Sequence, residues 1–319
     1  MEKFPINKTN FLTQSYSIII VLGTPLAAIG TMLNLFLAYL LLSERRMRDI
    51  TYIFIFTLVI SDCVSQFTSS VYFIVMAISK LNYQHGTIAC RLFFFVSISS
   101  YSVSVLALCL IALDRYLAIM RPTTPWTVKS KYKIAILSVF IIVLLSILLA
   151  SPLFYYVRSP ADIPGFCDLI PTTKSLRIYL LIGAALIYLM PATVLITIYS
   201  KIIVYMKLHI RPEEIPGRSN TDSRPPKRKF IKMMINIGLS YLATTWPFFA
   251  VLTGLAISGK NFRQLANESM AIFILALLSF SATMSISIIN PCLYLKYDRN
   301  LKRISKLTIQ RLCRRLLRN

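Results

Sequence analysis

Seven long apolar stretches alternate with short polar segments along this chain of 319 residues. Each stretch reaches or exceeds the roughly 20 residues that a helix needs to cross the hydrocarbon core of a bilayer. The stretches occupy residues 16–42, 52–78, 92–120, 134–156, 176–206, 230–257 and 270–295. The pattern predicts seven transmembrane helices, which would place the two termini on opposite sides of the membrane.

The residues within the stretches favour helices over a membrane β-barrel. Leu, Ile, Val and Phe run continuously, whereas barrel strands would alternate apolar and polar residues. The first stretch is too long and begins too late for a signal peptide, and no small-residue cleavage site follows it. The sequence therefore predicts an all-α membrane protein in which the first span is retained.

Charge is scarce, and its distribution gives the orientation. Only 15% of the residues are charged, against roughly 25% in soluble proteins, and the net charge is +23. Of the 35 Lys and Arg residues, 26 lie on the side that holds the C-terminus, and cytoplasmic loops carry such an excess. We therefore expect an extracellular N-terminus and contact with anionic lipids. Nucleic-acid binding is disfavoured, because the basic residues flank spans and form no recognisable binding fold.

The chain divides into three parts. Residues 1–15 are predicted to form an outer tail, residues 16–296 a single seven-helix bundle, and residues 297–319 a cytoplasmic amphipathic helix and tail. Apolar positions in the last part share one helical face, and basic residues fill the other, as in an interfacial helix. Those apolar positions are Leu301, Ile304, Thr308, Leu312 and Leu316.

Two motifs interrupt the apolar pattern where bilayer physics disfavours polar or helix-breaking residues. Asp114-Arg115-Tyr116 ends the third span, and Asn290-Pro291-Cys292-Leu293-Tyr294 ends the seventh. With seven spans, these motifs resemble the rhodopsin-like family of G-protein-coupled receptors. Ala118-Ile119-Met120-Arg121-Pro122 is similar to peptide-receptor members. The resemblance implies a receptor that binds an extracellular ligand and activates a heterotrimeric G protein at the plasma membrane.

The resemblance also assigns roles at the inner end of the bundle. Asp114 can hold the Arg115 guanidinium against its own helix until activation releases it toward the G protein. Tyr199 and Tyr294 match the two tyrosines that assist Arg115. Family members often pair this Arg with an acid in span six, but the region reads Lys227-Arg228-Lys229. We therefore expect activity without ligand. An ordinary interfacial Arg is the structural alternative.

Span six departs from the family pattern at its centre. Prolines at 191, 247 and 291 match the hinges that the family places in spans five, six and seven. Trp246 is adjacent to Pro247, one residue later than usual, which rotates its ring by about 100° around the helix. Thr245 takes the usual aromatic position. Tyr241 and Phe248 remain as residues that can transmit a shift from the ligand.

Asp62 is an acid deep within span two, where a charge requires a partner or a function. A protonated, hydrogen-bonded acid is one interpretation. The resemblance implies another, in which polar side chains surround a hydrated cavity that accepts a sodium ion, since oxygen ligands suit a hard cation. The candidate residues are Asn34, Asp62, Ser104, Ser287 and Asn290. Ile286 replaces a usual polar residue, which weakens the expectation of a bound ion.

Several residues outside the core of the bundle have predicted modifications. Cys90 and Cys167 both lie on the oxidising side, so a disulfide is allowed, and the resemblance implies one; two unbridged thiols are the alternative. Asn7 begins a glycosylation sequon in the outer tail. Cys313, on the amphipathic helix, is a candidate for acylation.

The ligand class is constrained mainly by residues that are missing. Ser97 stands where amine receptors of the family carry an Asp, and Met284 stands where opsins carry the retinal Lys. The predicted cavity wall is apolar and aromatic, with few polar anchors. It comprises Ser97, Tyr101, Phe248, Phe249 and Phe280, which could equally be core residues. Basic residues outnumber acids at the outer opening of this cavity, so a ligand with some negative charge would be steered in. We favour a short peptide as the ligand.

Three other functions are alternatives to that of a receptor. A cation-coupled transporter or channel could use Asp62, but the chain has one buried acid, no internal repeat and no pair of broken helices. The displaced Trp246 is compatible with a receptor-like protein that no longer couples. Enzyme activity is disfavoured, because His85 and His209 both lie in predicted loops and no nucleophile and base are paired.

Overall fold

The structure, a computed structural model, describes residues 6–43, 49–78, 82–120, 128–161, 166–209 and 226–316. Seven spans within these ranges are long and apolar enough to cross a membrane. They are formed by α1 (Ile6–Ser43), α2 (Ile50–Ile78), α3 (Tyr83–Met120), α4 (Val128–Ala150), α6 (Lys174–Ala184) continued by the π-helical turn η2 (Ala185–Leu189) and α7 (Met190–His209), α8 (Pro226–Ser258), and α10 (Met270–Tyr297).

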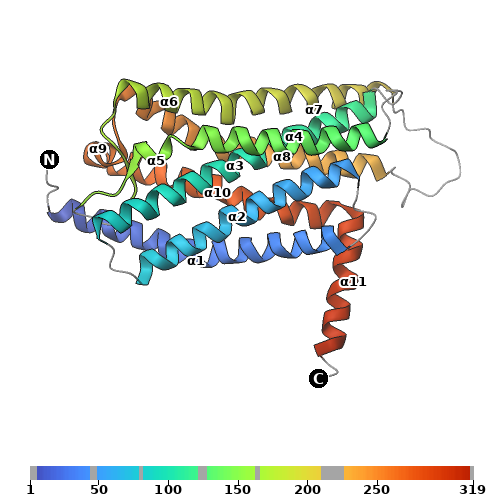
Figure 1. Ribbon diagram of the computed structural model, residues 1–319, viewed down its shortest axis with the longest axis horizontal. Helices are drawn as coiled ribbons and strands as arrows, with labels where there is room; N and C mark the ends of the chain where they lie inside the picture. The colour runs from blue at the N-terminus through green and yellow to red at the C-terminus, as the bar shows by residue number, and fades with distance from the viewer. Residues whose placement is uncertain are drawn as a thin grey trace, which may run out of the picture.

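The spans lie side by side in one bundle, and α11 (Arg299–Leu316) leaves the end that the charge distribution predicts to face the cytoplasm, here called the inner end (Figure 1). The first described residues, at the start of α1, lie at the opposite end of the bundle, as does α9 (Phe262–Glu268). The predicted fold class, a seven-helix membrane bundle followed by an eighth helix, is therefore confirmed. Helix α1 begins at Ile6, within the predicted outer tail, so the boundary between tail and bundle stays a prediction.

Two prolines each leave a backbone carbonyl free to accept a hydrogen bond from another span. A proline has no N–H, so the carbonyl four residues earlier loses its intrahelical partner. The carbonyl of Ile187, four residues before Pro191, accepts the Tyr241 hydroxyl of α8 at 3.0 Å. The carbonyl of Ser287, four residues before Pro291, accepts the Asn34 amide of α1 at 2.8 Å. Each proline thus provides a polar attachment between two spans.

A small β-hairpin and a short helix form the outer surface. Strands β1 (Val157–Arg158) and β2 (Asp168–Leu169) pair antiparallel, after the single turn of α5 (Leu153–Tyr156). The Cys90–Cys167 disulfide, which confirms the predicted bridge, fastens this hairpin to α3. Arg91 Nε adds a hydrogen bond of 3.0 Å to the Val157 carbonyl. The hairpin is therefore fixed to the outer end of α3.

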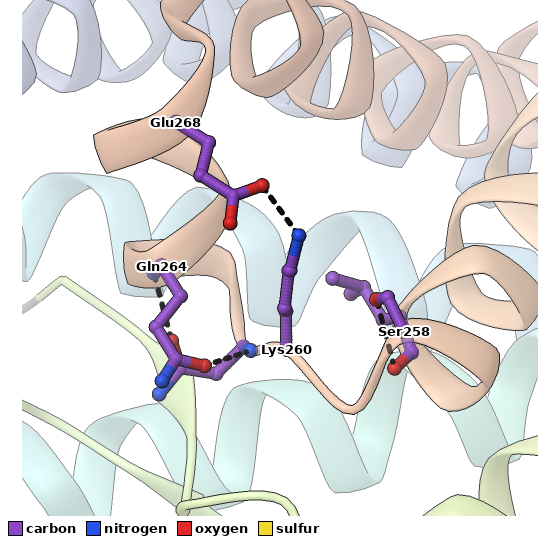
Figure 2. Close-up of polar contacts among 6 residues, drawn as sticks. Ser258, Lys260, Gln264 and Glu268 are labelled. Atoms are coloured by element: carbon purple, nitrogen blue, oxygen red, sulfur yellow. Dashed lines mark hydrogen bonds and ion pairs between the residues drawn. The ribbon is translucent and has the colours of Figure 1, made fainter.

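Helix α9 is capped and stabilised by side chains of its own segment. Asn261 and Gln264 form a capping box, in which each side chain bonds the other residue's backbone N–H. Lys260 forms an ion pair with Glu268 across the same short segment (Figure 2). Gly259, with a φ of 73°, provides the left-handed turn that ends α8. These contacts give the connection between α8 and α10 a defined shape.

Helix α11 begins at a polar cap connected to α2. Asp298 Oδ1 accepts the backbone N–H groups of Asn300 and Leu301, and Asp298 Oδ2 accepts the Tyr52 hydroxyl at 3.1 Å. Leu301 is fully buried against the bundle, whereas Leu307 and Ile309 are exposed. The cap therefore sets the point at which α11 turns away from the last span, as Figure 1 shows.

Candidate functional site

The inner end of α3 holds its arginine against the preceding residue. Arg115 Nε and Nη2 donate to Asp114 Oδ2 at 3.1 and 2.7 Å. The same oxygen accepts the Thr51 hydroxyl of α2 at 2.6 Å, a partner that the sequence analysis did not identify. Thr51 is buried at the inner end of α2, where a polar residue opening an apolar stretch was the available signal. Asp114 therefore binds Arg115 while it is itself fixed by the neighbouring helix.

No acid from α8 reaches this arginine, because α8 contains neither Asp nor Glu. The side chains of Lys227, Arg228 and Lys229 lie outside the described residues, although their backbone belongs to α8.

Tyr116 faces α7, where Lys201 Nζ lies 6.0 Å from the centre of the Tyr116 ring. That separation is at the outer limit of a cation–π contact.

Tyr199 and Tyr294 are buried near the inner end of the bundle. Neither hydroxyl has a hydrogen-bond partner among the described residues. Gly238 of α8 permits the close approach of Tyr199, since a Cβ there would lie 2.8 Å from Tyr199 Cε2.

The predicted polar network at mid-membrane is assembled around Asp62. Asp62 Oδ1 accepts the hydroxyls of Ser104 and Ser287 at 2.7 and 3.0 Å, and Oδ2 accepts the Asn290 amide at 2.9 Å. Asn34 joins through the Ser287 carbonyl. Ser61, which the sequence analysis missed although it is adjacent to Asp62, lies 2.6 Å from Ser104 Oγ. Four spans thus meet at one buried carboxyl group.

These residues fit a small hard cation. The Oδ1 atoms of Asn34 and Asn290 are buried and have no partner among the described residues. With the Asp62 carboxylate they offer oxygen donors of the type that hard cations prefer. The chemistry of the donor set is therefore compatible with sodium.

The centre of α8 contains an aromatic cluster that does not include its tryptophan. Trp246 is 56% exposed and faces away from the bundle, while Thr245 is fully buried and donates to the Tyr241 carbonyl. The one-residue displacement seen in the sequence thus moves the indole to the outside. Neighbouring rings form a continuous string, with centroids 5.2–6.2 Å apart. It comprises Phe280, Phe248, Phe249, Tyr188, Tyr101 and Tyr241.

The outer half of the bundle contains a cavity of about 380 Å³. Of the five predicted pocket residues, Phe248 and Phe280 line it. The other three, Ser97, Tyr101 and Phe249, are buried and do not contribute to its wall. Most of the remaining wall comes from residues of α1, α2 and α10 that the sequence did not single out as lining a cavity. Apolar residues of these spans carry no signal that separates cavity wall from core.

Asp168 joins the hairpin to α9 above this cavity. Its Oδ1 accepts the backbone N–H groups of Leu169 and Phe262 at 2.8 and 3.0 Å. Burial raises the pKa of Asp168 from the usual 3.8 to about 6, although these hydrogen bonds and the charge of Arg158 oppose the rise. The outer loops are thus joined by a carboxyl group that titrates near neutral pH.

The bundle is of the receptor type. It has seven membrane-spanning helices, an arginine held at the inner end of the third, and a loop bridged to the outer end of that helix. The chain belongs to the 7 transmembrane receptor (rhodopsin family), whose profile matches residues 33–294. The predicted family resemblance is therefore confirmed.

Curated relatives cover most of this chain. It is 28% identical over 293 residues to the Substance-P receptor of Aquarana catesbeiana, covering 88% of this chain and 66% of the relative. It is 28% identical over 286 residues to the Neuromedin-K receptor of Homo sapiens, covering 86% and 59% respectively. The human Substance-K receptor is 27% identical over 276 residues, covering 82% and 65%. The chain thus spans less than two thirds of the length of these relatives.

Proposed function

We propose that this protein is a G-protein-coupled receptor of the plasma membrane that binds a short extracellular peptide and activates a heterotrimeric G protein. Its N-terminus lies outside the cell, in agreement with the excess of Lys and Arg on the opposite side. The observation that carries the proposal is the state of Arg115, which is held by Asp114 of its own helix while α8 provides no acid.

Activation requires the inner end of α8 to move outward. Asp114 and Thr51 fix Arg115 in the resting arrangement. When α8 moves, the arginine gains access to the inner opening, where it contacts the G protein. Because Gly238 of α8 lies against the Tyr199 ring, movement of α8 frees this tyrosine to assist Arg115, and Tyr294 is proposed to assist it as well.

The conformational change that ligand binding causes is transmitted to α8 through the aromatic string and not through Trp246. Phe248 and Phe280 meet at the cavity wall, with ring centroids 5.4 Å apart. The string continues to Tyr241, whose hydroxyl bonds the Ile187 carbonyl of η2. A displacement at the cavity therefore alters the contact between α8 and the fifth span, six residues before Pro247 in α8.

Two observations support a peptide ligand. The matching relatives bear the names of receptors for substance P, neuromedin K and substance K. The outer surface is rich in basic residues, of which Arg91 and Arg177 donate to backbone carbonyls and so are fixed in place. Lys174 is exposed nearby. A peptide with an acidic group would be steered toward this surface.

The test is ligand-stimulated nucleotide exchange on a panel of Gα subunits, with short peptides as ligands. Arg115→Ala should abolish exchange, because the arginine contacts the G protein. Lys133→Ala removes an exposed cation from the inner end of α4 and should leave exchange unchanged. Stimulated exchange that survives Arg115→Ala would contradict the coupling mechanism, and exchange driven solely by non-peptide ligands would contradict the ligand class.

We propose further that the Asp62 network binds a sodium ion, which favours the resting bundle. Asp62 would supply the charge, and Ser104, Ser287 and the Oδ1 atoms of Asn34 and Asn290 the remaining oxygens. Sodium chloride should then raise the thermal stability of the purified protein above that in choline chloride. Asp62→Asn should abolish the difference, and a sodium effect that persists in this variant would contradict the site.

Three surface roles complete the proposal. Exposed basic residues of α11 bind anionic lipids of the inner leaflet; they are Arg299, Lys302, Arg303, Lys306, Arg311 and Arg314. Cys313 is exposed on the same helix, as acylation requires. Asn7 is proposed to carry a glycan; its backbone belongs to α1, and its side chain lies outside the described residues.

One observation favours a second candidate, a receptor-like protein that no longer couples. The outward-facing Trp246 cannot contact a ligand inside the bundle. The exchange assay separates the two functions, because a non-coupling protein would bind ligand without stimulating any Gα subunit.

A further inference from the structure

We propose that the outer cavity is a binding site for the aliphatic chain of a membrane lipid, which enters from the bilayer between α1 and α10. The peptide contact proposed above lies at the basic outer surface over this cavity, and both occupants would act on α8 through the wall that Phe248 and Phe280 form.

The cavity, here called the wedge, lies between α1 and α10 on the outer side of their mid-membrane contact. Helices α1 and α10 meet near mid-membrane, where Asn34 bonds the Ser287 carbonyl. At the same level Gly30 lies against Ile288, since a Cβ on Gly30 would fall 2.9 Å from Ile288 Cγ1. Beyond this contact both spans continue toward the outer side and line the cavity. The contact therefore closes its inner floor.

The mouth of the wedge faces the bilayer. Leu22 and Leu26 of α1 line the cavity and are nevertheless 61% and 54% exposed. On the facing edge, Leu278 of α10 lines the cavity and is 57% exposed. All three belong to membrane spans, so their exposed surface contacts lipid. The cavity therefore opens to hydrocarbon along the gap between α1 and α10.

The outer end is covered by loop residues. Phe166 and Phe262 line the cavity from the hairpin and from α9. Phe166 is 5% exposed and packs against Phe273 of α10, with ring centroids 6.0 Å apart. Asp168 holds the two loops together through the Phe262 N–H. Access along the membrane plane is therefore more direct than access from water.

The lining selects an uncharged, apolar guest. The lining residues include no Asp, Glu, Lys, Arg or His. Its polar donors are already bonded within the protein: Gln66 to the Met284 carbonyl, Ser69 to Ser65, Ser281 to Leu277 and Ser285 to Ala282. The Tyr72 hydroxyl lies 3.0 Å from Cys167 Sγ, so a peptide backbone would find few partners here to replace its hydrogen bonds to water. A hydrocarbon chain has no such loss and gains by burial.

The inner wall connects the guest to α8. Phe280, Phe94 and Phe248 line the cavity, and their rings contact one another through Phe280. Phe248 is adjacent to Pro247 in α8. A chain that reaches this wall therefore contacts the beginning of the aromatic string.

The test uses the full chain, purified into phosphatidylcholine nanodiscs, and a long-chain fatty acid that carries a photoactivatable diazirine near the chain end. After illumination, labelled residues are identified by mass spectrometry. We expect adducts on the cavity wall in excess of those on the lipid-facing residues Phe140 and Leu144 of α4. Unlabelled fatty acid of the same length should lower the labelling of the wall, because a site is saturable and general lipid contact is not.

Two tryptophan substitutions form the matched pair. Leu278→Trp fills the mouth, whereas Leu275→Trp makes the same change at a 63% exposed position of α10 outside the cavity. Leu278→Trp should lower cavity labelling about tenfold, the factor that corresponds to excluding on the order of two methylene groups. Leu275→Trp should leave it unchanged. Ser281→Trp, at a second exposed position of the mouth, replaces Leu278→Trp if that variant does not fold.

Equal labelling of α4 and the cavity would overturn the proposal, as would labelling that neither mouth substitution lowers. Because the readout is adduct formation and not nucleotide exchange, these outcomes are independent of G-protein coupling.

Discussion

The two ends of the bundle are built on different principles. At the inner end, individual polar groups have assigned partners, as in the bonds of Asp114 to Arg115 and Thr51. At the outer end, aromatic and aliphatic walls enclose a cavity, and a disulfide and one buried acid hold the covering loops. In the proposed receptor, coupling thus depends on specific residues, whereas ligand binding depends on the shape of the cavity.

Among the variants that test this difference between the two ends, removal of the outer disulfide should have the largest effect on stability. Cys90→Ala with Cys167→Ala releases the hairpin from α3 and should lower the free energy of unfolding by about 2–5 kcal/mol. The melting temperature of the purified protein in detergent measures this loss. The matched control, Cys63→Ala with Cys292→Ala, changes two thiols within spans and should have a smaller effect. Equal losses would show that the hairpin attachment does not stabilise the outer end.

The second test uses the pH dependence of the outer loops. The pKa of Asp168 is about 6 in the folded protein and near 3.8 ordinarily, so the folded state binds the proton more tightly. Stability should therefore rise as pH falls from about 7 to 4 and be lost as pH rises through 6, by on the order of 3 kcal/mol in total.

Asp168→Asn should remove most of this dependence when melting temperature is followed against pH. Glu268→Gln alters an exposed acid of the same surface and should retain it. A pH dependence shared by the wild type and Asp168→Asn would assign the effect to other groups.

A third test concerns packing at the inner end. Gly238→Ala places a Cβ 2.8 Å from the buried Tyr199 ring, whereas Gly254→Ala meets nothing within 4 Å in the same helix. Overpacking should make Gly238→Ala destabilising by about 1–2 kcal/mol. Gly254→Ala should be neutral or stabilising by up to about 1 kcal/mol, because alanine favours a helix. If both variants behave alike in thermal unfolding, Tyr199 does not press on α8 as described.

The smallest effect distinguishes the aromatic string from the displaced tryptophan. Tyr241→Phe leaves the Ile187 carbonyl without its partner and should cost about 1 kcal/mol. Trp246→Phe alters an exposed ring and should change stability by less than about 0.5 kcal/mol. Ligand-stimulated exchange should fall in Tyr241→Phe and persist in Trp246→Phe. The reverse order would return the signalling role to Trp246.

The sequence predicted the fold well because the bilayer imposes a simple rule on it. All seven spans and the eighth helix follow from apolar length and from the placement of basic residues. The Asp62 network was also predictable, since buried polar residues within apolar spans are few and tend to find one another. Asp114 and Arg115 were predictable because they are adjacent.

The cavity was less predictable, because apolar residues look alike in a sequence. Phe249 and Tyr101 pack in the core while Phe248 and Phe280 line the cavity, and no pattern separates the two pairs. The contribution of α1 depends on where that helix separates from α10, which is set by the Gly30 and Asn34 contacts. The role of Asp168 required the meeting of two loops that are distant in sequence. Tertiary packing, not local pattern, determines these features.

The proposed receptor couples at its inner end, and its α8 carries no acid that could hold Arg115 in the resting state. Nucleotide exchange without ligand is therefore the decisive measurement, made in membranes that contain the wild-type chain. We expect exchange above that of mock membranes and a fall to the mock level in Arg115→Ala. Wild-type exchange equal to that of mock membranes, or exchange unchanged by Arg115→Ala, would contradict this expectation.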